Sequence, residues 1–289
     1  MTHRFPIGCL AIAVLAAVSV PAAAQGPRMT DARLAELARK PTPRLADGKS
    51  DLNGTWDHLG GIEFVRPQSL DDGSVCVVGC PPPAAARAGG AGGRAGGPAA
   101  APPAPNFPKY KQEFLARVKD LSERQVDVDT ALQCQPPGVP RIGPPAKIVQ
   151  TAREVLFLYD DVNGSFFRII PTDGRPHRKD LPESYLGDAV GRYEGDTLVV
   201  ETVNFNEETW LTDNGAFHTK GLTVIERLRR VGDTIQYEAV AHDPAVLVEP
   251  WKERTQTLWL TDREIEESPR CEDRDLDLIT DGSHHDNPR

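Results

Sequence analysis

Short apolar runs with strand-like alternation dominate the second half of the chain. From Lys147 onward, runs rich in Val, Ile, Phe, Tyr and Thr are separated by turn signals such as Asn163-Gly164 and Gly232-Asp233. This spacing is typical of antiparallel hairpins. It predicts strands near 147–151, 154–160, 165–171, 189–194, 196–205, 222–230, 233–242 and 255–261, with an earlier pair near 53–57 and 62–65.

The strands point to a mainly β fold. No strong amphipathic helix alternates with them, which disfavours a doubly wound parallel sheet. About ten antiparallel strands with tight turns are typical of a barrel or a sandwich. Gly54-Thr55-Trp56, on the first strand, matches the Gly-x-Trp of lipocalin-type barrels, in which the Trp closes one end. We expect an antiparallel lipocalin-like barrel, with a β-sandwich as the alternative.

Two short helices accompany the strands. Thr30 is placed to cap a helix that runs through Arg39 and stops before Pro41. Residues 109–125 predict a second helix, with apolar positions along one side. The expected organisation is a signal peptide at 1–24, a helical arm at 25–50, a single β domain at 51–262 and an acidic tail at 263–289. A Pro, Ala and Gly insertion at 81–108 and the 109–125 helix interrupt the β domain.

The N-terminus predicts export. One positive charge at Arg4 precedes an apolar run from Phe5 to Val20, and Ala22-Ala23-Ala24 follows before Gln25. A run too short to span a bilayer comfortably, followed by small residues, is typical of a signal peptide cleaved after Ala24. No later apolar stretch reaches spanning length. We therefore expect a periplasmic or secreted protein with no membrane span after processing.

The net charge and the absence of certain motifs exclude some classes of partner and cofactor. The formal net charge is −9 and no basic run occurs, so nucleic acid is not an expected partner. No Gly-x-Ser-x-Gly occurs, and the Gly cluster at 89–97 lacks the flanking strand and helix of a phosphate-binding loop. We expect no cofactor and a small-molecule ligand or substrate, and the oligomeric state is open.

Four cysteines remain after the predicted cleavage, an even number that predicts disulfides in an oxidising compartment. Of the three possible pairings we favour Cys76 with Cys80 and Cys134 with Cys271. Zinc is the alternative, but only one paired spacing is present and no His lies beside it. No metal site is expected.

Two carboxylates are candidates for acid–base chemistry. Strand alternation puts Glu201 on a face with Val199 and Val203, and Glu226 on a face with Val224 and Leu228. Both would then point to an apolar side, which is costly unless the carboxylate is paired or its pKa is raised. One interpretation is an internal salt bridge with Arg168, Arg175 or Arg192. The other is a general acid or base in a barrel cavity.

His177 and His218 are the candidate imidazoles, because each lies in a loop beside a strand end. Asp173 or Asp213 could orient them for proton transfer. The alternative is that both loops are plain turns with an exposed His nearby. A metal site would need His177, His218 and Glu201 to converge, with His242 as a further candidate ligand, and their spacing does not require this.

Several segments resemble a family of uncharacterised secreted bacterial proteins. The resemblance is carried by Cys134-Gln135-Pro136-Pro137-Gly138-Val139-Pro140-Arg141, by Asp173-Gly174-Arg175-Pro176-His177 and by Gly191-Arg192-Tyr193-Glu194-Gly195-Asp196-Thr197-Leu198-Val199-Val200-Glu201-Thr202. It covers most of residues 50–271 and supplies no reaction. The segment around Cys271 departs from a Tyr-rich Cys-His-Glu pattern in relatives.

Two functions follow from these residues. The first is an exported small-molecule enzyme, a lyase, isomerase, dehydratase or hydrolase, using His and carboxylate chemistry in a barrel cavity. Its expected catalytic residues are His177, His218, Glu201, Glu226 and Asp173. The alternative is a lipocalin-like protein that binds an apolar or aromatic ligand without transforming it. Its expected ligand-binding residues are Arg175, Tyr193, Trp210 and Trp251.

Overall fold

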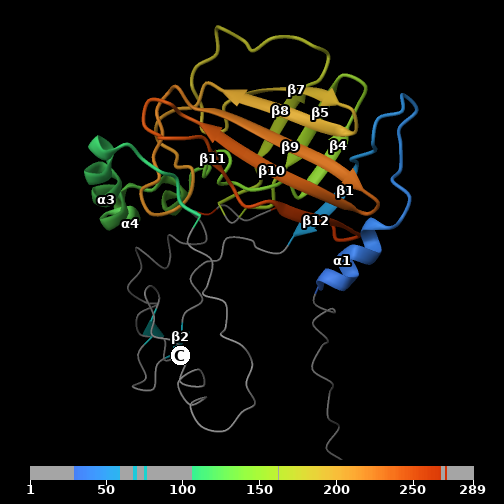
Figure 1. Cartoon of the computed structure of the whole chain (residues 1–289), viewed down its shortest axis with the longest axis horizontal. Helices are drawn as coiled ribbons and strands as arrows, with labels where there is room; N and C mark the ends of the chain where they lie inside the picture. The colour runs from blue at the N-terminus through green and yellow to red at the C-terminus, as the bar shows by residue number, and fades with distance from the viewer. Residues whose placement is uncertain are drawn as a thin grey trace, which may run out of the picture.

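An antiparallel sheet of ten strands, nine of them along one continuous hydrogen-bonded path, forms the body of the protein (Figure 1). The computed structural model describes residues 29–58, 68–69, 75–76, 106–161, 163–267 and 271. In sheet order the strands are β6 (Phe167–Pro171), β5 (Glu154–Leu158), β4 (Lys147–Gln150), β1 (Gly54–His58), β12 (Gln256–Thr261), β10 (Thr234–His242), β9 (Thr223–Val231), β8 (Thr197–Val203) and β7 (Asp188–Glu194).

The sheet curls into a nearly closed barrel. The first strand, β1, pairs with β4 on one side and with the last strand, β12, on the other. β6 and β7 end the hydrogen-bonded path and pack against each other. The predicted antiparallel, lipocalin-like barrel is confirmed, and the sandwich alternative is not what forms.

The observed strands follow the predicted ones closely, with two short additions. β11 (Trp251–Lys252) pairs with β10, and β2 (Gln68–Ser69) pairs with β3 (Val75–Cys76) as a separate hairpin. Strands of two residues are too short to show a period of two, which is why the sequence did not reveal them. The strand expected at 62–65 lies outside the described residues.

The first expected helix is present as α1 (Asp31–Ala38), and the Thr30 side chain accepts a hydrogen bond from the Arg33 backbone N–H at 3.2 Å. The helix expected at 109–125 is divided. It consists of the 3₁₀ turn η1 (Gln112–Phe114), α3 (Leu115–Glu123) and α4 (Gln125–Val128), followed by the 3₁₀ turn η2 (Thr130–Gln133). In Figure 1, α1 lies at one end of the barrel and α3 and α4 lie at the other.

Two apolar clusters fill the interior. The first is built around Trp56, Phe157 and Tyr237, and the second around Phe205, Phe217 and Trp251. Along β9, Leu228 belongs to the first cluster and Val224 to the second. Glu226 lies between these two residues on the same face of β9, and it is therefore placed where the two clusters meet.

The Gly-x-Trp residues pack at the α1 end. Trp56 is 1% exposed, its indole N–H donates to the Leu52 carbonyl at 3.0 Å, and the Arg230 guanidinium lies 5.0 Å from its ring centroid. Gly54 has φ +139°, and a Cβ there would lie 2.5 Å from Leu260 Cδ1. The backbone conformation therefore favours glycine at this position, and a larger residue would also require the Leu260 side chain to move.

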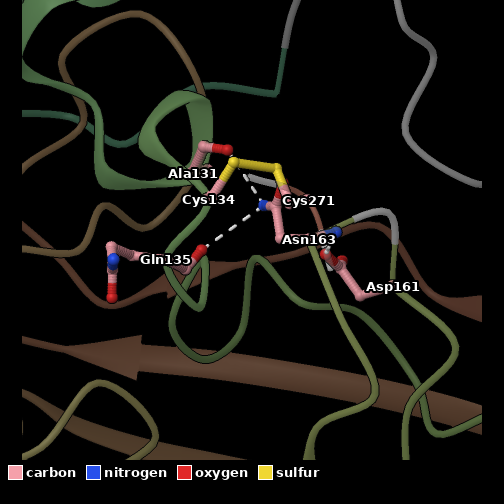
Figure 2. The surroundings of a disulfide bond; sticks show 6 residues. All are labelled: Ala131, Cys134, Gln135, Asp161, Asn163 and Cys271. Carbon is pink, nitrogen blue, oxygen red and sulfur yellow. Dashed lines mark hydrogen bonds between the residues drawn. A yellow bond between two sulfur atoms is a disulfide. The ribbon is translucent and has the colours of Figure 1, made fainter. Parts of the chain in front are cut away.

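One predicted disulfide is present. Cys134 and Cys271 are bonded, which ties the C-terminal segment to the end of η2 (Figure 2). Asn163, from the loop after β5, lies beside the bond and donates its amide to the carbonyls of Ala131 and Gln135 at 2.9 and 3.3 Å. A structural disulfide is typical of proteins that fold in an oxidising compartment.

Several expectations concern parts of the chain that the structure leaves undescribed. These are the signal peptide at 1–24, most of the 81–108 insertion, the Cys76–Cys80 pairing and most of the tail beyond 267. Among the described helices, none has the length and apolar character needed to cross a bilayer.

Candidate active site

The two candidate carboxylates lie on opposite faces of the sheet. Glu226 shares the inner face of β9 with Val224 and Leu228 and is fully buried inside the barrel. Glu201 lies on the outer face of β8, with 39% of its side chain exposed. The expectation that both carboxylates share one enclosed space is therefore wrong, and strand alternation is the physical reason.

Glu226 forms an ion pair with Arg168 inside the barrel, one of the pairings expected from the sequence. Arg168 Nη2 lies 2.7 Å from Glu226 Oε2, and the two side chains are 3% and 0% exposed. The contact is an ion pair rather than a well-aligned hydrogen bond. Glu226 Oε1 also accepts a hydrogen bond from the Tyr237 hydroxyl at 3.1 Å.

Arg168 reaches this position because β6 presents Phe167 and Ile169 outward and Arg168 inward. The neighbours Phe167 and Ile169 are exposed, whereas Arg168 is 5% exposed. Its guanidinium donates to the Tyr159 hydroxyl at 3.0 Å and to Thr202 Oγ1 at 2.6 Å. Burial is the largest single influence and lowers the pKa of Arg168, but the contacts with Glu226 and Tyr159 together outweigh it, so that the pKa is raised.

The two tyrosines of this cluster are held neutral. Burial is the main cause that raises the pKa of both Tyr159 and Tyr237, and the nearby charge of Glu226 adds to it. Each hydroxyl is committed to one charged partner, Arg168 for Tyr159 and Glu226 for Tyr237. Neutral phenols can donate hydrogen bonds without adding charge to the cluster.

Glu253 is a second inward carboxyl. Its backbone N–H donates to the Ala239 carbonyl at 2.9 Å, and Ala239 pairs with Glu226 on the other side. Glu226 and Glu253 thus flank a small buried alanine. Burial first, and then the charge of Glu226, raise the pKa of Glu253 to about 8, although the Gln256 amide donates to Oε1 at 3.3 Å.

Several buried polar atoms of this cluster have no hydrogen-bond partner among the described residues. They are Arg168 Nε, Glu253 Oε2 and Gln256 Oε1. Unpaired buried donors and acceptors are rare in folded proteins and mark positions where a further polar group can bind. Glu253 and Gln256 are only partly buried as whole residues, so the cluster approaches the surface on their side.

We call these residues the barrel cluster: Arg168, Glu226, Glu253, Gln256, Tyr159, Tyr237 and Thr202. His58 is on the same inner face, since it follows Trp56 by two positions on β1 and pairs with Leu258. His58 is therefore a diagonal neighbour of Gln256, which lies two residues before Leu258 on β12. The sequence did not single out His58, Glu253 or Gln256.

His177 is on the outer face and contacts two carboxylates. Its Nδ1 lies 2.9 Å from Asp188 Oδ2 and its Nε2 lies 3.3 Å from Glu201 Oε1, with 22% of the side chain exposed. Asp173 does not orient it. That carboxylate is held by Arg175, at 2.6 Å, and by Arg153, and the hydrogen bond from Arg175 is the main cause that lowers the pKa of Asp173.

His218 is buried beside the second apolar cluster, with its ring centroid 5.9 Å from that of Phe205. Its Nδ1 lies 3.0 Å from the Thr219 carbonyl, which can only accept, so Nε2 accepts from the Thr209 hydroxyl at 2.8 Å. Burial lowers the pKa of His218. Asp213, the expected partner, instead pairs with Arg141 at 2.6 Å.

The expected ligand-binding aromatic residues are part of the packed interior. Trp210 and Trp251 are 3% and 7% exposed and belong to the second cluster. Tyr193 packs against the first cluster, and its hydroxyl accepts from the Gln150 amide at 2.6 Å. Arg175 is exposed and bound to Asp173. The structure therefore does not bring these four residues together around one ligand.

Among the described residues, no group of three or more His, Cys, Asp or Glu side chains is arranged to hold a metal ion. Comparison of the chain with family models, with curated proteins and with solved structures finds no match. The resemblance to secreted bacterial proteins stays a prediction.

Proposed function

We propose that the protein is an exported small-molecule enzyme that uses acid–base chemistry in the barrel cluster. The observation that carries the proposal is the pairing of two inward carboxyls in different environments. Glu226 is in contact with a buried cation, whereas Glu253 has no cationic partner among the described residues and a pKa of about 8. A pair of carboxyls whose environments differ in this way is the usual arrangement for assigning acid and base roles.

Each residue has a role in this proposal. Glu253, with its pKa near physiological pH, gives or takes the proton. Arg168 and the neutral tyrosines stabilise charge that develops beside it. His58, on the same inner face, supplies the imidazole of a His and carboxylate pair. Reactions that a general acid and base can catalyse without a covalent intermediate, such as elimination, isomerisation or hydrolysis by an activated water, suit this set because it holds no nucleophilic Ser or Cys.

The test compares turnover by wild type and by Glu253→Gln. Both proteins are incubated with a cell-derived metabolite extract, and the small molecules are analysed by mass spectrometry before and after. Wild type should alter one or more metabolites and Glu253→Gln should not. The matched control is Glu249→Gln, on an exposed residue paired with Lys109, which should behave as wild type.

Two results would contradict the proposal. Retention of an unaltered metabolite by both proteins would indicate a binding protein instead. Loss of turnover in His177→Ala, with Glu253→Gln still active, would place the chemistry on the outer face.

Export has a separate test. The Cys134–Cys271 bond supports an oxidising compartment. When the full chain is expressed in a bacterium with a signal peptidase, N-terminal sequencing of the protein released from the periplasm should begin at Gln25. A protein that starts at Met1 and stays in the cytoplasm would contradict export.

A further inference from the structure

The outer face of β4, β5 and β6 is apolar and exposed. Strand register aligns Val149, Leu156 and Ile169 in one row across the three strands, and Leu158 with Phe167 in the next. Phe167 is 62% exposed, Ile169 50% and Val149 36%. We call these five residues the apolar face.

Other outer faces of the barrel are different. The outward positions of β7 and β9 carry charged residues that pair with one another, as Arg192 and Arg227 do with Glu194. A solvent-facing sheet surface is normally polar in this way. Large contiguous apolar patches are uncommon on the surfaces of monomeric soluble proteins and often mark interaction sites.

Charged residues bound the apolar face at its two ends. Lys147 is beside Leu158 at one end, and Glu154 follows the turn at the other. Both belong to the outward set, since their neighbours Ile148 and Val155 are buried. A second copy turned about a two-fold axis that crosses the strands along the Val149–Leu156–Ile169 row would bring each Lys147 near the other copy's Glu154.

We propose that the protein forms a symmetric dimer through the apolar face. The surface fits a second copy because it is self-complementary. Its central row, Val149, Leu156 and Ile169, meets the same row of the second copy, and its cation meets the partner's anion, as an isologous interface requires. The rim charges set the orientation of the two copies more than the strength of the dimer. This proposal does not depend on the proposed enzymatic function.

The mass of the protein in solution tests the dimer. Size-exclusion chromatography with light scattering, at micromolar concentrations, should give twice the mass of one chain for wild type. Ile169→Lys should give the mass of one chain, because it buries a charge in the interface. The matched control is Val126→Lys, on α4, where an apolar side chain is 76% exposed. It should remain a dimer.

Charge reversal tests the orientation. Lys147→Glu and Glu154→Lys should each raise the dissociation constant, because each brings like charges together. The double variant should recover the wild-type value, since the pair is then exchanged. Thermal transitions close to that of wild type would show that the barrels are folded. A monomeric wild type, or a dimer that persists in Ile169→Lys, would overturn the proposal.

Discussion

Glu226 and Glu253 lie on either side of Ala239 on the inner face of the barrel, and in the part of the chain that the structure describes a cation, Arg168, lies beside Glu226 alone. The small alanine leaves the two carboxyls without a large side chain between them. The charge of Glu226 therefore acts on Glu253 and helps to keep it protonated. The same arrangement determines how stability should respond to mutation and to pH.

Removal of the Glu226 charge should destabilise the barrel strongly. Glu226→Gln leaves Arg168 buried without its counter-ion, which costs about 3–5 kcal/mol in comparable buried pairs. Urea denaturation of the variant should show this loss of unfolding free energy. Glu194→Gln, which breaks exposed pairs with Arg192 and Arg227, is the control and should unfold close to wild type. Equal midpoints for the two variants would contradict the account of the ion pair.

Glu253 should make the protein less stable as the pH rises. Its folded pKa of about 8 is above the ordinary value of 4.5. The folded state therefore holds a proton that the unfolded state releases between these values. This contribution to stability is complete below about pH 4.5 and is lost as the pH approaches 8.

The measurement is the unfolding free energy of wild type minus that of Glu253→Gln. The difference should fall by up to about 1.4 kcal/mol per pH unit within that window. Glu249→Gln, exposed beside Lys109, should show no such trend. A difference that stays constant with pH would mean that Glu253 is ionised in the folded protein.

His218 should make the protein less stable as the pH falls, which is the opposite of the effect of Glu253. Burial lowers its pKa from the ordinary 6.5, so the folded state keeps the imidazole neutral while the unfolded state binds a proton. Its contribution is present above pH 6.5 and is lost as the pH falls below this value. Wild type should lose stability there more steeply than His218→Gln, in denaturant titrations at matched pH. Parallel curves would exclude this explanation.

The Cys134–Cys271 bond should contribute to stability through the unfolded chain. The two residues are separated by 137 positions, and removal of a native disulfide typically costs about 2–5 kcal/mol. The double variant Cys134→Ser with Cys271→Ser should melt at a lower temperature than wild type. Reductant should lower the melting temperature of wild type more than that of the variant. If the reductant lowers the melting temperature of both proteins equally, it acts through cysteines other than Cys134 and Cys271.

The sequence predicts the fold better than the site, and β8 shows why. Glu226 could be placed inside because β9 alternates cleanly, with buried residues at every second position. In β8, Leu198, Val199 and Val200 are all buried, so both faces of the strand are apolar there. Alternation then cannot tell the inner face from the outer one, and Glu201 was placed on the wrong side.

The sequence does not identify Glu253 as a site residue, for a different reason. Glu253 follows β11, a strand of two residues that shows no period. Its environment depends on Glu226, on a strand elsewhere in the sheet, and no local pattern encodes that proximity. His177 was found because its loop has recognisable turn chemistry. Its partner Asp188 was not, because the contact spans 11 positions of irregular chain.

The position of β1 has a consequence for how the molecule is made. A ribosome synthesises this strand early, yet its two neighbours in the sheet are β4, which begins at Lys147, and β12, which ends at Thr261. The first strand must therefore wait, unpaired along at least one edge, until nearly the whole polypeptide has been synthesised. Pairings between such distant segments form slowly. A holding chaperone that shields β1 during this interval should raise the yield of folded protein more than one that acts after release.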